Sequence, residues 1–165
     1  MYARERLSEI AVNAINGLLV DGSGAIPKRS RMQKVELKIS QFIPVQTVSE
    51  LNTHQHFRVA NRRHQIQKDA VRKMMPRTGY PQPCVVRLSR VGYRSLDTGD
   101  NLPASLKWIR DQLSELIVHS YDKPGQPYVI KKACGRNDDD PRIVWEYSQD
   151  PKHPQTGVRI DIYEI

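Results

Sequence analysis

Strand-like and helical patterns alternate along this chain, and their order restricts the folds that it can adopt. Apolar residues at every second position indicate a half-buried strand, and apolar residues three or four positions apart indicate a helix with one buried side. This order predicts an α+β fold, in which a small mixed β-sheet is flanked by helices. The strand-like runs are 35–40, 84–91, 142–147 and 158–163, and the helical segments are 57–75 and 102–118.

The two C-terminal strand-like runs are joined by a short turn that contains proline and glycine. Strands with such a connection usually pair with each other in antiparallel fashion. We therefore expect residues 142–147 and 158–163 to form a closing hairpin. In the first strand, Val35, Leu37 and Ile39 alternate with charged residues, which predicts that these three face the core.

The residues before the first strand have a different character. Apolar residues recur at helical spacing within 3–20, and a basic connector that contains proline follows at 26–32. We divide the chain into an N-terminal helical extension and linker at 1–32 and a main domain at 33–165, which has the length of one ordinary domain. A further stretch with several prolines and glycines, 119–137, is expected to be a long and partly ordered excursion.

Neither the cysteines nor the hydropathy indicates secretion or a membrane span. Cys84 and Cys134 are isolated and form no CxxC pair, so we expect free thiols in a reducing compartment. No apolar run approaches the ~18 residues that cross a bilayer. The sequence therefore predicts a cytoplasmic protein.

Positive charge is concentrated in one part of the chain. The 26 Lys and Arg residues outnumber the 18 Asp and Glu residues, for a formal net charge of +8, and ten of these cations lie within 54–94 beside one acid, Asp69. Such an excess favours a polyanionic partner, above all nucleic acid. On the helical segment 57–75, the side expected to be buried carries Ala60, Ile66, Ala70, Val71 and Met74, and most cations fall on the other side. The cations expected to bind phosphates are Arg58, Arg62, Arg63, Lys68, Arg72 and Lys73.

The acidic residues are fewer, and three groups of them stand beside the ends of expected elements: Asp97, Asp100 and 138–140. Carboxylate oxygens are ligands that Mg²⁺ prefers, and two such ions can activate a water and stabilise the leaving oxygen in phosphodiester hydrolysis. The alternative is purely structural, because Asp is common in turns and at helix N-caps. On that interpretation Asp97 belongs to a turn, Asp100 caps a helix, and 138–140 form a solvated loop.

Two motifs relate these acids to a known family. They are Leu96-Asp97-Thr98-Gly99-Asp100-Asn101-Leu102 at a helix start and Asp139-Asp140-Pro141-Arg142-Ile143-Val144 before a strand. With the order of elements over about residues 33–165, they resemble the RusA family of phage and prophage Holliday-junction resolvases. The resemblance implies a Mg²⁺-dependent endonuclease, with Mn²⁺ as the alternative metal, that cuts four-way DNA junctions in a bacterial or phage-infected cell. We expect a homodimer, because a four-way junction offers two symmetric strands to cut.

The resemblance also implies roles for individual residues. Asp97, Asp100 and Asp140 match the family's metal-binding carboxylates, with Asp139 as the adjacent alternate, and a metal-bound water would attack the phosphodiester. Lys107 is the nearest substitute for a lysine that the family carries three positions after the asparagine of the first motif.

The first motif departs from the family pattern by one inserted residue. The family has one residue between its two carboxylates, whereas this chain has Thr98-Gly99. A glycine-containing bulge can absorb such an insertion, which leaves the nuclease hypothesis intact. The second hypothesis is a junction-binding protein that keeps the fold and the basic surface without hydrolysis.

Aromatic and histidine residues complete the candidate contacts. Phe57 and Tyr93 are each flanked by arginine and are the candidates for contact with an opened junction. Trp145 lies in an apolar strand, which favours core packing. Three histidines lack a cysteine or carboxylate at a zinc spacing, so we expect them in loops or near the DNA backbone; they are His54, His56 and His64.

Overall fold

The computed structural model describes residues 35–49, 57–128 and 137–165. The predicted N-terminal helix, the basic connector, His54, His56 and Cys134 lie outside these ranges. Apart from Val35, the described residues belong to one compact unit, Glu36–Ile165.

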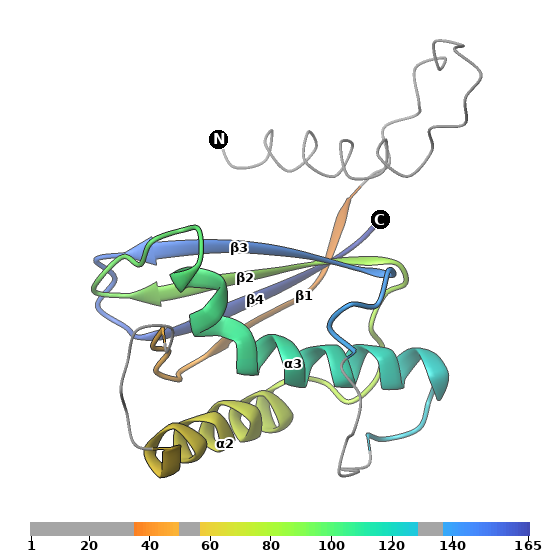
Figure 1. Ribbon diagram of the computed structural model, residues 1–165. Helices are drawn as coiled ribbons and strands as arrows, with labels where there is room; N and C mark the ends of the chain where they lie inside the picture. The colour runs from red at the N-terminus through yellow and green to blue at the C-terminus, as the bar shows by residue number, and fades with distance from the viewer. Residues whose placement is uncertain (1–34, 50–56, 129–136) are drawn as a thin grey trace, which may run out of the picture. The chain divides into compact units, whose positions relative to one another are not determined.

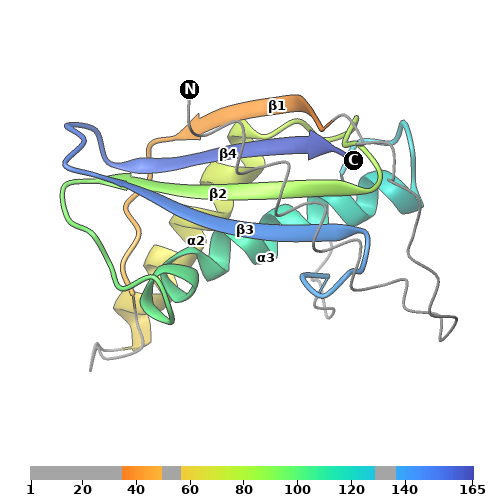
Figure 2. The ribbon, with the colours of Figure 1, turned by 90° about the horizontal axis from the view of Figure 1, so that it is seen from above.

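A four-stranded sheet and two helices make up this unit (Figure 1). The sheet order is β1-β4-β2-β3, with β2 and β3 parallel and the other two pairs antiparallel. Both helices cover the same face of the sheet (Figure 2). The α+β prediction with a small mixed sheet is therefore confirmed. The elements are β1 (Glu36–Ile43), α2 (Phe57–Met74), β2 (Cys84–Gly92), α3 (Asn101–Asp122), β3 (Ile143–Pro151) and β4 (Gly157–Glu164).

The predicted hairpin of the last two strands is wrong. β2 lies between β3 and β4, so these two strands do not pair with each other, although they follow one another in sequence. Burial explains the order, because Val158, Ile160 and Ile162 in β4 are all 0% exposed, whereas most side chains of β3 are only partly buried. The more apolar strand takes a central position, and β3 forms an edge.

The predicted inward direction of Leu37 is also wrong. Its side chain is 50% exposed. The register of β1 against β4 shifts between Leu37, which pairs with Tyr163, and Ile39, which pairs with Ile162. Such an irregularity places successive odd-numbered residues on different faces. Ile39 packs against the core, while Leu37 does not.

Helix α2 buries only part of the line of residues that was predicted to face the core. Val71 is buried as predicted, but Ile66 and Met74 are 54% and 37% exposed, and Gln67, which was not predicted to face the core, is buried. The Gln67 amide nitrogen donates a 2.9 Å hydrogen bond to the backbone carbonyl of Gln46, in the segment after β1. This polar anchor rotates the helix away from the orientation that apolar periodicity alone favours.

Helix α3 supplies much of the core. Its predicted apolar side is confirmed, and the helix continues one turn past residue 118, to Asp122. No helix within the described ranges is long and apolar enough to cross a membrane. The side chains of α3 predicted to be buried are each at most 1% exposed: Leu102, Leu106, Ile109, Leu113 and Leu116.

Candidate nucleic-acid interface

The six cations predicted to contact phosphates all lie on α2, but they differ in exposure. Three of them, Arg58, Arg62 and Lys73, are exposed, and the other three are half-buried. Arg72 forms a 3.2 Å ion pair with Asp69, the single acid of this helix. The outer side of α2 is therefore predominantly cationic. The half-buried cations are Arg63, Lys68 and Arg72.

A contact between the two helices adds a second group of cations. The imidazole of His64 on α2 stacks on the indole of Trp108 on α3, with ring centroids 4.0 Å apart. The ammonium groups of Lys68 and Lys107 lie 5.0 Å and 5.1 Å from the same indole ring. The negative face of the indole attracts both charges, so cations from α2 and α3 are held together.

Sequence reasoning missed this arrangement. The i,i+4 spacing of His64 and Lys68 places them on one side of α2, and Lys107 directly precedes Trp108 on α3. Those spacings are visible in the sequence, but the docking of α2 on α3 is a tertiary fact. Lys107 is exposed and lies about two helical turns beyond Asp100.

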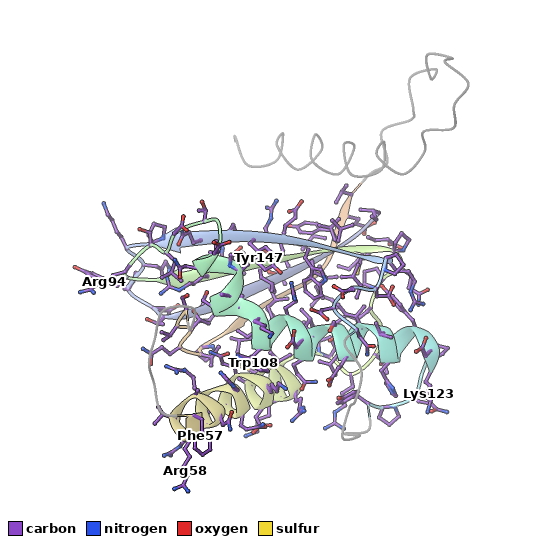
Figure 3. All side chains as sticks on the ribbon, in the orientation of Figure 1. Phe57, Arg58, Arg94, Trp108, Lys123 and Tyr147 are labelled. Carbon is purple, nitrogen blue, oxygen red and sulfur yellow. The ribbon has the colours of Figure 1, made fainter. Side chains whose placement is uncertain are left out.

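The two aromatic residues predicted to meet an opened junction are both exposed. Phe57 is 64% exposed and Tyr93 is 78% exposed. The guanidinium of Arg58 lies 5.8 Å from the centre of the Phe57 ring. Arg94, next to Tyr93, lies at the same end of the Glu36–Ile165 unit as Phe57 and Arg58 (Figure 3). Trp145 is instead partly buried against the core, and its indole N–H donates to the Asp138 carbonyl at 3.0 Å.

The two acidic motifs lie at opposite ends of the parallel strands β2 and β3. Because β2 and β3 are parallel, the chain leaves β2 at one end of this strand pair and enters β3 at the opposite end. Asp97 and Asp100 lie in the connection that leaves β2, whereas Asp139 and Asp140 lie in the segment that enters β3.

Hydrogen bonds fix the first motif near the far end of β3. Leu96, which precedes Asp97, exchanges two 2.8 Å hydrogen bonds with the side chain of Gln149. The six residue steps from Ile143 to Gln149 span about 20 Å of strand. The carboxylates of the two motifs are therefore too far apart within one copy to bind the same metal ion.

The Asp97 and Asp100 side chains belong to the start of α3. The Leu102 N–H donates to the Asp97 carbonyl at 3.0 Å, and the Gly99 N–H approaches the Asp97 carboxylate at 3.4 Å. Asp100 occupies the N-cap position, yet its side chain makes no capping hydrogen bond. The turn interpretation of Asp97 therefore fits, while the Asp100 carboxylate does not cap the helix.

Two of the three acids before β3 accept hydrogen bonds from arginine side chains. Asp138, whose side chain is 9% exposed, accepts a hydrogen bond from Arg110, which also donates to the Tyr147 hydroxyl at 3.1 Å. One oxygen of Asp140 accepts from the Arg142 backbone N–H and from Nε, both at 2.9 Å, and the other accepts from the Arg142 guanidinium at 2.7 Å.

These contacts do not fit the metal centre that the resemblance implies. Within residues 35–49, 57–128 and 137–165, no three His, Cys, Asp or Glu side chains are grouped so that they could hold a metal ion. The predicted set is thus divided between the two ends of the β2–β3 pair, with Asp97 and Asp100 at one end and Asp139 and Asp140 at the other. The physical reason is the parallel crossover, which separates the ends of β2 and β3 that carry the motifs.

A further carboxylate approaches Asp138 from α3. Burial, and then the negative charge of Asp138, raises the pKa of Asp111, while Lys107, Arg110 and Lys68 act in the opposite direction. This side of α3 therefore combines two carboxylates with three cations. Two of these cations, Lys68 and Lys107, also lie over the Trp108 indole, and the five groups together carry only a small net positive charge.

The Asp140–Arg142 pair has a measurable consequence for stability. Hydrogen bonds from the Arg142 guanidinium lower the pKa of Asp140 below its ordinary value of about 4. A lowered folded-state pKa stabilises the protein above the unfolded-state pKa, and this stabilisation is lost as the pH falls through the folded value. We expect Asp140→Asn to lower the free energy of unfolding by about 1 kcal/mol at pH 7.

Urea unfolding at pH 7 and at successively lower pH tests this expectation. The difference between wild type and Asp140→Asn should shrink as the pH falls below about 4, because the wild-type carboxyl becomes neutral. Asp139→Asn is the matched control, since Asp139 is the exposed neighbour and should change stability little at either pH. A difference that persists unchanged in acid would contradict the ionic role of Asp140.

Comparison of the chain with family models, with curated proteins and with solved structures gave no match.

Proposed function

We propose that this protein binds DNA through a cationic surface formed by α2 and the adjoining part of α3. We define this surface by Arg58, Arg62, Lys68, Lys73 and Lys107. The observation that carries the proposal is the one-sided charge of α2, where six cations accompany one acid and three of the cations are exposed. A regular row of phosphates is the partner that such a surface favours.

The properties of the surface favour backbone contact over base recognition. Its members are long side chains with charged ends, and two of them are held against the Trp108 indole. Contacts of this kind position a protein on a duplex but carry no sequence information. We therefore propose binding that depends on the shape and charge of DNA, including branched DNA, rather than on its sequence.

The nuclease activity implied by the RusA resemblance stays a prediction. Hydrolysis through a shared metal centre requires carboxylates from both motifs, and one copy of the chain does not bring them together. We assign no catalytic step to Asp97, Asp100, Asp139, Asp140 or Lys107. The function that the geometry supports best is the second of the two hypotheses from the sequence, a RusA-like DNA-binding protein, with a homodimer as part of that hypothesis.

Charge removal on α2 tests the proposal. We expect the double variant Arg62→Gln/Lys73→Gln to bind a four-way DNA junction about 10-fold more weakly than wild type in 100 mM salt, because two phosphate contacts are lost. The slope of log affinity against log salt should decrease by about 2, close to one unit for each contact. Fluorescence anisotropy with a labelled junction at several salt concentrations measures both quantities.

Lys123→Gln is the matched control, because Lys123 is an exposed cation that directly follows the C-terminal end of α3. It lies far from Phe57 and Arg58 at the start of α2 (Figure 3). We expect it to leave the affinity unchanged. Equal losses from the control and the double variant would indicate a diffuse charge effect and contradict the proposed surface. The same samples with Mg²⁺ also address hydrolysis: strand cleavage that Asp100→Asn abolishes would establish the nuclease hypothesis.

A further inference from the structure

One end of the molecule carries two exposed aromatic rings, each beside an arginine. Phe57 begins α2 and precedes Arg58, whereas Tyr93 follows β2 and precedes Arg94. Among the large hydrophobic side chains of the described residues, these two are the most exposed, at 64% and 78%. The connection from β2 to α3, which contains Asp97 and Asp100, lies at the same end (Figures 1 and 2).

The charges at this end differ from those of the cationic surface. Arg58 is the last member of that surface, whereas Arg94 shares the connection after β2 with Asp97 and Asp100, and all four side chains are exposed. A carboxylate repels phosphate, so the row of phosphate contacts along α2 ends at Arg58 and does not extend to Arg94. Bases are uncharged and present flat π-faces, and they are therefore suited to aromatic rings in such surroundings.

We infer that Phe57 and Tyr93 stack on unpaired bases and so direct the protein to branched or opened DNA rather than to intact duplex. The inference rests on the proposed function, because α2 must first hold the backbone. In an intact duplex the base faces are already stacked on each other and offer nothing to these rings. At a branch point or a gap, bases are free to leave the stack and contact an aromatic side chain or an arginine plane.

The alternative occupant is a lipid surface. Exposed apolar residues on a basic helix also suit anionic membranes, and α2 additionally exposes Val59 and Ile66. Tyr93, however, lies on the connection that follows β2 rather than on α2, so the two rings do not belong to one amphipathic helix face. That arrangement favours separate bases over a membrane plane.

The test compares two DNA probes that differ only in unpaired bases. One is a fully paired 30-base-pair duplex, and the other is the same duplex with a central gap of four unpaired nucleotides that contains 2-aminopurine. We expect the full-length wild-type protein to bind the gapped probe more tightly and to change the 2-aminopurine fluorescence on binding. Phe57→Ala and Tyr93→Ala should each weaken binding to the gapped probe about 10-fold and leave duplex binding unchanged.

Two further variants separate stacking from general apolar contact. Tyr93→Phe retains the ring and should bind the gapped probe with the affinity of the wild type, unlike Tyr93→Ala. Ile66→Ala removes an aliphatic side chain of comparable exposure, 54%, and should leave both probes unaffected. Circular dichroism confirms that each variant is folded.

The outcomes distinguish the inference from the proposed function. Equal losses on both probes, or no loss on either, overturn the stacking role of Phe57 and Tyr93 while duplex binding by α2 still stands. Failure of the wild type to bind either probe overturns both. Binding to vesicles of anionic phospholipid that Phe57→Ala and Ile66→Ala both abolish, without a preference for the gapped probe, would assign the apolar side chains to a membrane surface instead.

Discussion

Replacement of Gly157 with alanine is expected to lower the free energy of unfolding by about 3 kcal/mol. Gly157 begins β4 beside the end of β1, where a Cβ would lie 2.4 Å from Cζ of Phe42 and 2.6 Å from the carbonyl oxygen of Ile43. The Phe42 ring can turn aside, but the carbonyl accepts a 2.9 Å hydrogen bond from the Val45 N–H. Relief of the overlap therefore requires a shift of the β1 backbone.

Urea unfolding followed by circular dichroism measures this loss. Gly92→Ala is the matched control, because Gly92 ends the neighbouring strand β2 and a Cβ there would lie an ordinary 3.8 Å from its nearest neighbour, the Arg90 side chain. We expect the control to change the unfolding free energy by less than about 1 kcal/mol. Coincident unfolding curves for wild type and Gly157→Ala would contradict the close approach of β1 and β4.

Truncation of Ile160 to alanine is expected to cost about 4 kcal/mol. This side chain is fully buried in β4, between Gln41 of β1 and Leu88 of β2. Its removal loses the transfer free energy of the deleted groups and leaves a cavity that neighbouring strands on both sides prevent from closing.

Two comparison variants relate this loss to the strand order. Ile160→Val keeps most of the volume and should cost about 1 kcal/mol. Val144→Ala, in the edge strand β3, should also cost only about 1 kcal/mol, since Val144 is partly exposed. A loss from Ile160→Ala no larger than the loss from Val144→Ala would contradict the central position of β4.

The elements of the main domain could be predicted from the sequence because their signals are local. Apolar spacing located α2, β2 and α3 within a few residues of their observed bounds. The start of α3 was also recognisable, from Asp100 and Asn101 before Pro103 in the first turn. These features depend on residues a few positions apart, so tertiary contacts did not override them.

Strand order and helix orientation could not be predicted in the same way. The interleaving of β2 between β3 and β4 depends on which strand is most apolar on the face covered by helices. Leu37 does not face the core because the β1–β4 register is irregular there. Ile66 does not face it because Gln67 is buried instead, where it donates a hydrogen bond to the Gln46 carbonyl. Both causes involve partners far away in sequence.

The arrangement of the candidate metal-binding carboxylates could not be predicted, because it depends on topology rather than on the motifs themselves. The family resemblance assigned Asp100 and Asp140 to one metal site, and the motifs do not say at which end of its strand each of them lies. A parallel pair joined by a helix always places the exit of one strand opposite the entry of the next. The α2 part of the cationic surface was more predictable, because its four cations lie on a single helix, whereas the contribution of Lys107 depends on the docking of α3.

The stacking of His64 on Trp108 also gives the molecule an intrinsic optical probe. The chain has two tryptophans, and Trp108 is the one whose indole is contacted from α2, by an imidazole and an ammonium group. Its emission therefore reports whether α2 and α3 are docked and whether the lysines still lie over the ring. A polyanion that draws those ammonium groups toward itself changes the surroundings of the fluorophore directly, so occupancy of the surface becomes visible without any attached dye.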